Sequence, residues 1–195
     1  MKPARLTRSP KTALTLVAIC LAAWTPARAS QTPQADFAET YQARQTTLTR
    51  TGTGVLKYLG FISIYRGALY LPPDVDPQQA LADVPKRLEV KYLRAFDKED
   101  FGPATLAGIK NNVSTETFAR LESRIAYHNS LYEDIAPGDR VALTYIPAEG
   151  TRVEINGLPQ GTVEGADFAA ALFSMWLGDK PFDKGFKQAL LGDRR

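Results

Sequence analysis

The stretch YIPAEGTRVEINGLPQGTVEG, Tyr145–Gly165, is dense in turn signals. Two short alternating runs flank Asn156-Gly157, and this dipeptide favours a two-residue hairpin turn because both residues tolerate positive φ. A third run, VALTYI, precedes Pro147. Because turn residues account for the whole pattern, we interpret the stretch as the folding signal of an antiparallel sheet rather than as a catalytic loop system.

Further strands are predicted before this stretch. TTLTRTGTGVLKYLGFISIYRGALYLP predicts a strand pair that turns near Gly60 and stops at Pro72-Pro73. KRLEVKYLR predicts a half-buried strand, because apolar residues alternate along it: Leu88, Val90 and Tyr92.

Helices are predicted in two blocks. Asp97 and Asp100, or Gly102-Pro103, can open the first, and Ser114 is a suitable N-cap for the second. The second has an apolar stripe at steps of three and four: Phe118, Leu121, Ile125, His128 and Tyr132. The third, ADFAAALFSMWLG, ends at Gly178, and a short helix closes the chain. Strands and helices in blocks predict an α+β fold with a large antiparallel sheet covered on one face by helices, an open-faced β-sandwich.

The first 29 residues are predicted to be a signal peptide. Basic residues precede the apolar run TALTLVAICLAAW, and the triplet Ala27-Arg28-Ala29 follows, so cleavage is expected before Ser30. An uncleaved anchor is the alternative, although the run is short of the about 20 residues that span a bilayer. Export implies a periplasmic or secreted protein with no stable membrane insertion after cleavage. Residues 30–195 then form one domain, with 30–46 as a loosely ordered lead.

Cleavage would change the net charge and the cysteine content of the protein. Five of the 24 basic residues and none of the 21 acidic ones precede Ser30, so the remainder carries 19 basic against 21 acidic residues, a net charge of −2. A nucleic-acid partner is therefore not expected, since it requires a basic face. Cys20 is the only cysteine and His128 the only histidine. No metal site, cofactor or thiol nucleophile is predicted, and His128 fits a packing position on its helix.

Two cations lie at the ends of predicted strands. If Val55 faces the helices, alternation places Lys57 on the same side, and Val90 and Tyr92 place Arg94 there likewise. Such cations need partners, because an unpaired buried charge is costly. They either snorkel or pair with an acid at the core edge, or they line an anion-binding cleft between sheet and helices.

Four segments resemble the bacterial chalcone isomerase-like family: GTGVLKYLGFISIYRGALYLP, RLEVKYLRAF, YHNSLYEDIAPGDRVALTYIPAEGTRVEINGLPQGTVEG and DFAAALFSMWLGDKPFDKGFKQALLG. The resemblance implies a sheet under a layer of helices with a cleft between them. It also implies two kinds of function: the plant enzymes cyclise chalcones to flavanones, and related plastid proteins bind fatty acids.

The catalytic set of the plant enzymes does not transfer to this chain. Leu56 stands where the resemblance expects an arginine and Tyr65 where it expects a threonine. The segment DKEDFGPATLAGIKNN lacks the expected tyrosine. No catalytic residue is therefore predicted, and whether the protein is an enzyme stays open.

Three functions remain from the sequence. The first is non-catalytic binding of a small amphipathic or fatty-acid-like partner in the cleft by Arg94, Lys57, Tyr92 and Tyr65, roofed by the stripe from Phe118 to Ile125. The second is an intramolecular lyase or isomerase with a different catalytic set. The third is a structural or accessory protein with a vestigial cleft.

Overall fold

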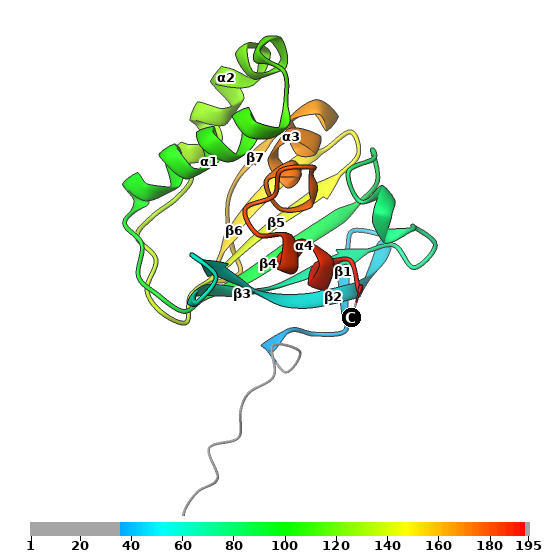
Figure 1. Ribbon diagram of the computed structural model, residues 1–195. Helices are drawn as coiled ribbons and strands as arrows, with labels where there is room; N and C mark the ends of the chain where they lie inside the picture. The colour runs from blue at the N-terminus through cyan, green and yellow to red at the C-terminus, as the bar shows by residue number, and fades with distance from the viewer. Residues whose placement is uncertain (1–35, 194–195) are drawn as a thin grey trace, which may run out of the picture. The chain divides into compact units, whose positions relative to one another are not determined.

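The computed structural model describes residues 36–193. The predicted signal peptide, its cleavage position and the first part of the predicted lead lie outside the described residues. In the described part the chain forms a seven-stranded antiparallel sheet with four α-helices, as the α+β prediction requires (Figure 1).

The sheet is a meander, because each strand pairs with the next along the chain. Its strands are β1 (Thr40–Ala43), β2 (Thr46–Tyr58), β3 (Ile62–Leu71), β4 (Lys86–Tyr92), β5 (Arg140–Ile146), β6 (Gly150–Ile155) and β7 (Leu158–Val163). A 3-10 turn, η2 (Pro77–Gln79), lies between β3 and β4.

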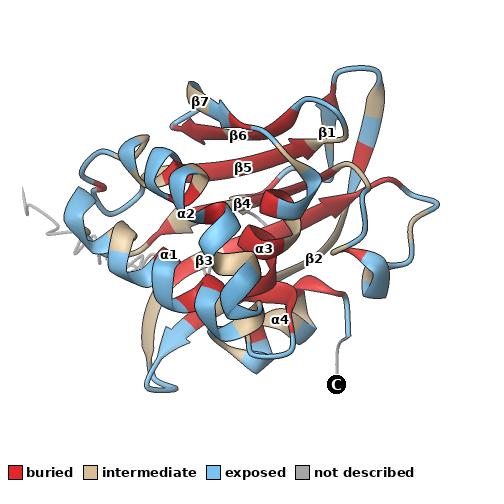
Figure 2. Cartoon of the chain, turned by 90° about the horizontal axis from the view of Figure 1, so that it is seen from above, coloured by how far each residue is buried: buried red, intermediate tan, exposed pale blue. Residues whose placement is uncertain are grey.

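Four helices cover one face of the sheet: α1 (Lys98–Asn112), α2 (Thr115–Ser130), α3 (Ala166–Leu177) and α4 (Lys184–Leu190). The Ser114 hydroxyl accepts from the Thr117 N–H at 3.1 Å, which confirms the predicted N-cap of α2. Helix α3 is buried along most of its length, whereas α1 and α2 keep exposed outer sides (Figure 2). The main core therefore lies between α3 and the sheet.

The Asn156-Gly157 turn has the structural role that the sequence predicts. Both residues have positive φ, 51° and 80°, and Ile155 pairs with Leu158 across the turn. The Asn156 side chain also accepts from the Arg140 N–H at 2.9 Å and donates to Asp139 at 3.1 Å. These bonds tie the β6–β7 turn to the start of β5 and explain the turn chemistry by folding alone.

The predicted loose lead is wrong for residues 40–46. Strand β1 pairs with β2, and Phe37 is 5% exposed in a small core on the face of the sheet that lacks helices, together with Leu48 and Tyr70. Asp36 bonds Arg66 and Lys91 on the same face, at 2.6 and 2.8 Å. Ion pairs and one buried aromatic ring hold the segment, although its sequence is polar.

The predicted alternation is right for β4 and wrong for β2. Leu88, Val90 and Tyr92 do face the helix-covered core. On β2, however, Leu56 is in that core, and a Cβ at Gly54 would lie 2.9 Å from Phe186 of α4, so Val55 points the other way. The error arose because small glycines mark the covered face of β2, where an apolar alternation would normally mark it.

Candidate functional site

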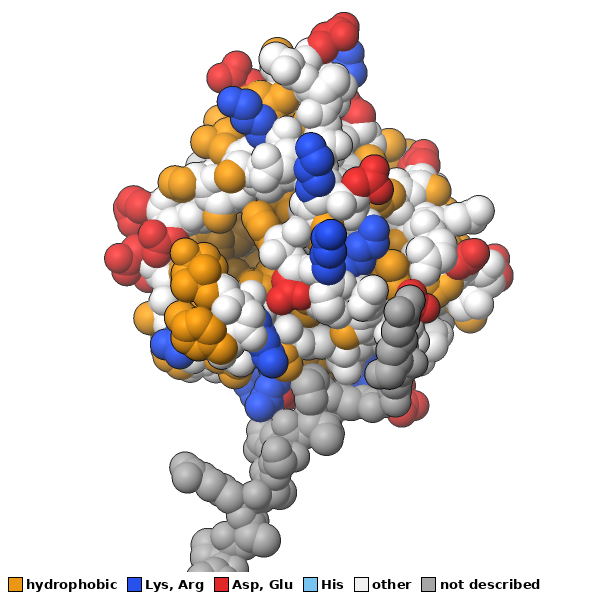
Figure 3. All heavy atoms as spheres, in the orientation of Figure 1, with side chains coloured by type: hydrophobic (Ala, Val, Ile, Leu, Met, Phe, Trp, Pro, Cys, Tyr) orange, Lys and Arg blue, Asp and Glu red, His pale blue; other side chains and the backbone are white. Residues whose placement is uncertain are grey.

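A cavity of about 590 Å³ opens between the ends of β2, β3 and β4 and helices α1 and α3. Its walls are mostly aromatic and aliphatic: Leu56, Tyr58, Ile64, Tyr65, Tyr92, Phe96, Phe101, Ala104, Tyr132, Met175, Trp176 and Phe182. Lys57, Asp100 and Thr105 add polar atoms. Figure 3 shows the hollow with hydrophobic side chains at its floor and rim. Its size and lining are typical of a small-molecule site.

Three of the four residues predicted from the sequence line this cavity: Lys57, Tyr65 and Tyr92. Lys57 reaches it for a reason other than the predicted alternation. The β2–β3 register shifts between Leu56 and Lys57, so these two consecutive residues both border the cavity.

The expectation that Arg94 faces the cleft is wrong. Strand β4 ends at Tyr92, so alternation no longer governs residue 94. The Arg94 side chain is exposed, does not line the cavity, and donates from Nε to the Ser63 carbonyl at 3.2 Å.

The predicted roof of Phe118, Leu121 and Ile125 is also wrong. None of these three residues lines the cavity, and Leu121 and Ile125 are fully buried in the core. The cavity is instead covered by α1, with Phe101 and Ala104, and by the α3 end with Trp176. Sequence reasoning missed these residues because an aromatic side chain in a cavity wall has the same pattern as one in a core.

The cavity contains two tyrosine hydroxyls of different kinds. Trp176 Nε1 donates to the Tyr65 hydroxyl at 2.6 Å, so the Tyr65 proton is free to be donated elsewhere. The Tyr92 hydroxyl has no hydrogen bond to any of residues 36–193. In the described part, the buried side-chain nitrogen and oxygen atoms that lack a hydrogen bond are Thr151 Oγ1 and Arg152 Nε. The Tyr92 oxygen lacks a hydrogen bond but is not among these buried atoms, so it is not enclosed in the core. The Tyr92 oxygen is therefore accessible from the cavity.

Both hydroxyls remain protonated at neutral pH. Burial raises the pKa of Tyr65 well above its usual value, with Tyr92 adding to the effect, and burial alone raises the pKa of Tyr92. The two rings lie edge to face with centroids 5.3 Å apart. The arrangement offers two neutral donors side by side in an aromatic wall, which suits a ligand oxygen with negative charge.

His128 is buried, as the packing interpretation predicts, and contacts the cavity only through Tyr132. Its Nε2 lies 3.3 Å from the Tyr132 hydroxyl and its Nδ1 3.3 Å from Asn129 Oδ1. The Asn129 oxygen can only accept, so Nδ1 carries the proton and Nε2 accepts from Tyr132. Burial lowers the pKa of His128 to about 4, so the ring is neutral at pH 7.

This shift predicts a pH-dependent stability. The unfolded chain binds a proton at His128 near pH 6.5, whereas the folded chain binds it only near pH 4. The contribution of neutral His128 to the free energy of unfolding is therefore fully present above pH 6.5. It is lost as the pH falls through 6.5 towards 4, by about 3 kcal/mol in total. His128→Gln removes this proton, so urea unfolding at several pH values should give a flatter profile for the variant. Parallel profiles for the two proteins would contradict the assignment.

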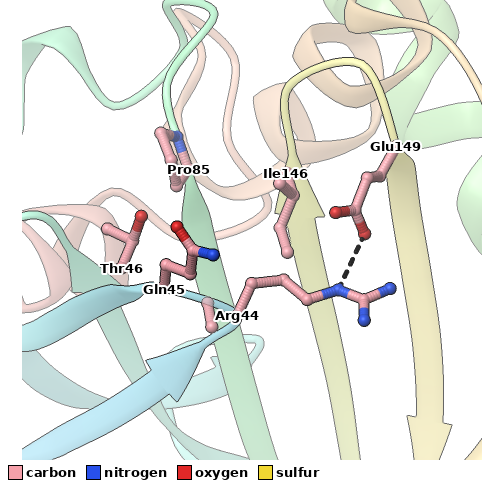
Figure 4. Close-up of a pocket in the computed structure, with 7 residues that line it drawn as sticks. Arg44, Gln45, Thr46, Pro85, Ile146 and Glu149 are labelled. Atoms are coloured by element: carbon pink, nitrogen blue, oxygen red, sulfur yellow. Dashed lines mark hydrogen bonds and ion pairs between the residues drawn. The ribbon is translucent and has the colours of Figure 1, made fainter.

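A second hollow of about 450 Å³ lies at the other end of the sheet, near the β1–β2 turn (Figure 4). Pro85, Ile146 and Thr46 contribute to its wall, and an ion pair of 3.2 Å between Arg44 and Glu149 lies across it. The ion pair satisfies the charges of this hollow internally. It offers no group comparable to the free Tyr92 hydroxyl.

No cluster of three or more His, Cys, Asp or Glu side chains in residues 36–193 could hold a metal ion. Within the same residues, no helix has the length and apolarity that crossing a bilayer requires.

Comparisons with known proteins agree with this fold. A family model described as chalcone isomerase-like matches residues 29–192. The crystal structure of a fatty-acid binding protein of Arabidopsis thaliana superposes with a TM-score of 0.65 at 15% identity, covering 80% of this chain and 91% of the plant protein. At this identity the superposition shows the fold alone. A comparison with curated protein sequences gives no match. With a family match over nearly the whole described chain, and the sheet and helices that the family implies, the protein belongs to the chalcone isomerase-like family.

Proposed function

We propose that the protein binds a small amphipathic carboxylate of the fatty-acid type in the cavity between sheet and helices, without catalysing a reaction on it. The observation that carries the proposal is the free Tyr92 hydroxyl beside Tyr65 in an otherwise aromatic cavity. The hydroxyls would hold the carboxylate, and the apolar wall would hold the chain. The fatty-acid binding title of the Arabidopsis structure supports the same ligand class.

Lys57 would add a positive charge at the same site. It borders the cavity and forms no ion pair with any residue of the described part. A cation without a partner that borders the same cavity as two hydroxyl donors lowers the cost of removing a carboxylate from water. Arg94, which was expected to supply the stronger contact, is excluded from this role by its exposed position outside the cavity.

Titration with medium-chain fatty acids tests the proposal. We expect saturable binding with one molecule per chain, seen by native mass spectrometry and by calorimetry. Ala104→Trp should abolish it, because Ala104 is exposed at the cavity wall, where an indole would obstruct the cavity without disturbing the core. Ala126→Trp is the matched control, since Ala126 is exposed on α2 and does not line the cavity. Absence of saturable binding in the wild type would reject the function.

The lyase or isomerase alternative rests on the family alone. Leu56, at the position where the resemblance expects an arginine, lines the cavity and is 8% exposed. An aliphatic side chain cannot stabilise a developing enolate oxygen, so the cavity lacks that electrophile. Saturable flavanone formation from a chalcone, lost in Ala104→Trp, would favour this alternative over simple binding.

Export is part of the same proposal. The basic start, the apolar run and Ala27-Arg28-Ala29 support removal of residues 1–29. We expect N-terminal sequencing of the protein from an extracytoplasmic fraction to begin at Ser30. A sequence that begins at Met1 would remove this part of the proposal and leave the binding site unaffected.

A further inference from the structure

The β2–β3 hairpin ends in three exposed apolar side chains next to the cavity. Tyr58, Leu59 and Phe61 are 59%, 67% and 74% exposed, and Tyr58 also lines the cavity. Figure 3 shows hydrophobic side chains projecting beside the hollow, where Figure 1 places this hairpin, with Lys and Arg side chains close by. Single exposed apolar residues are ordinary, but three within four positions form a patch that calls for an explanation.

The turn geometry does not favour a leucine at position 59. The Phe61 N–H donates to the Tyr58 carbonyl, and both central residues have positive φ, 51° at Leu59 and 78° at Gly60. Asn156 and Gly157 form a second turn of this kind with nearly the same angles, 51° and 80°. Asparagine tolerates this backbone region, whereas leucine is strained in it. The chain thus keeps a leucine at a position where asparagine would make the more stable turn.

Two unpaired cations stand at the base of this hairpin. Lys57 directly precedes Tyr58, and Arg94 is joined to the returning strand through its bond to the Ser63 carbonyl. Neither forms an ion pair with another described residue. The acidic residues near them lie on other elements: Asp97, Glu99 and Asp100 at the start of α1, and Asp183 before α4, whose carboxylate accepts from the Lys57 backbone N–H at 3.4 Å. Lys57 on the hairpin and Arg94 bonded to it therefore place two positive charges near the apolar tip.

We propose that this hairpin docks on an anionic lipid bilayer, so that the cavity can exchange its ligand with the membrane. Leucine and phenylalanine would enter the interface, tyrosine would sit at the level of the head groups, and Lys57 and Arg94 would meet lipid phosphates. An apolar tip and basic residues combine the two contributions that determine binding at a membrane surface, burial of apolar area and attraction to anionic lipids. The proposal rests on the proposed ligand binding, because a fatty-acid-like ligand resides mainly in membranes.

Leu59→Asn is the decisive variant, because structure and function predict opposite effects for it. The substitution should raise the melting temperature or leave it unchanged, since asparagine relieves the strained turn. It should weaken binding to vesicles of phosphatidylcholine and phosphatidylglycerol by about tenfold, because it removes one buried leucine from the interface. Arg94→Gln should weaken binding to the same vesicles by roughly fivefold and have little effect on pure phosphatidylcholine vesicles.

Leu158→Asn is the matched control. Leu158 follows the Asn156-Gly157 turn between β6 and β7, which lie at the opposite edge of the strand order from β2, and is also 67% exposed. The Leu158→Asn variant should therefore bind the anionic vesicles with the affinity of the wild type. Co-sedimentation measures vesicle binding of all variants as expressed. N-terminal sequencing of each sample confirms that residues 1–29 are either present in all of them or removed from all of them.

Several results would overturn the docking proposal. The first is that the wild type does not bind the anionic vesicles. The second is that Leu59→Asn binds them as tightly as the wild type. The third is that Leu59→Asn and Leu158→Asn lose the same amount of vesicle affinity. A solution dimer that Leu59→Asn dissociates would also overturn it, by making the tip a surface for a second copy. Titration with a water-soluble medium-chain carboxylate, without vesicles, separates the two proposals: Leu59→Asn should keep wild-type affinity, and failure of the wild type there rejects ligand binding alone.

Discussion

Tyr92→Phe is expected to weaken the binding of a medium-chain fatty acid by about 1.5–3 kcal/mol, or about ten- to a hundredfold. The hydroxyl would donate to the ligand carboxylate, and a hydrogen bond to a charged group is worth that amount. The same substitution should not lower the free energy of unfolding, because the hydroxyl has no partner among residues 36–193. Calorimetric titration and thermal unfolding of the same samples measure both quantities.

The companion variants make this result specific. Tyr65→Phe should weaken binding and also destabilise the fold by about 1–3 kcal/mol, because it leaves the Trp176 indole N–H without its acceptor. Tyr70→Phe is the control: this hydroxyl donates to the Ala38 carbonyl at 3.0 Å in the small core on the other face of the sheet. Tyr70→Phe should leave binding unchanged. If Tyr92→Phe binds the ligand like the wild type, the carboxylate is not held at Tyr92.

The sequence predicts most of the fold because most strands, β1 excepted, carry their own signals. Asn156-Gly157 determines one hairpin, and the alternation of Leu88, Val90 and Tyr92 correctly assigns the faces of β4. These signals are local, so they survive in the folded protein. Short turns make four of the six neighbouring strand pairs predictable: β1–β2, β2–β3, β5–β6 and β6–β7. Longer segments connect β3 to β4 and β4 to β5, so local turn signals do not determine these two pairings.

The candidate site was only partly predictable, because its geometry depends on departures from regular strands. Lys57 borders the cavity through a register shift, and Arg94 misses it because β4 ends two residues earlier. Neither a bulge nor a strand end can be located from alternation alone. Phe101 and Trp176 meet at the cavity through tertiary packing of α1 against α3, which no local pattern encodes.

The glycines of β2 are a second feature whose role the sequence alone does not show, in this case a role in stability. Gly52 and Gly54 are visible in the sequence, but their partner is helix α4, more than a hundred residues away. An added Cβ at Gly52 would lie 2.0 Å from the Ala189 carbonyl oxygen and 2.7 Å from that of Leu190. Both atoms are backbone, so the helix cannot relieve the overlap by turning a side chain.

Gly52→Ala is therefore expected to lower the free energy of unfolding by about 3 kcal/mol, the upper part of the range for overpacked sites. The Thr51 hydroxyl, which donates to the Leu190 carbonyl at 2.8 Å, would lose its partner as α4 moves away. Gly102→Ala, on α1, is the control, because the nearest atom to its added Cβ outside the adjacent residues, Asn129 Nδ2 of α2, lies at an ordinary contact distance of 3.8 Å. It should change the free energy of unfolding by less than about 1 kcal/mol, because the gain of alanine in a helix is offset by crowding of its Cβ against Pro103.

Gly52→Ala should also change the shape of the cavity, because it displaces α4. Phe182, in the wall of the cavity, lies just before this helix, and Asp183 caps the helix by accepting from the Phe186 N–H at 2.8 Å. Asp183 also accepts from the Lys57 N–H at 3.4 Å. A displaced α4 would shift both Phe182 and the backbone at Lys57. Fatty-acid affinity measured well below the melting temperature should therefore fall in Gly52→Ala, and unchanged affinity together with lost stability would show that the cavity forms independently of α4.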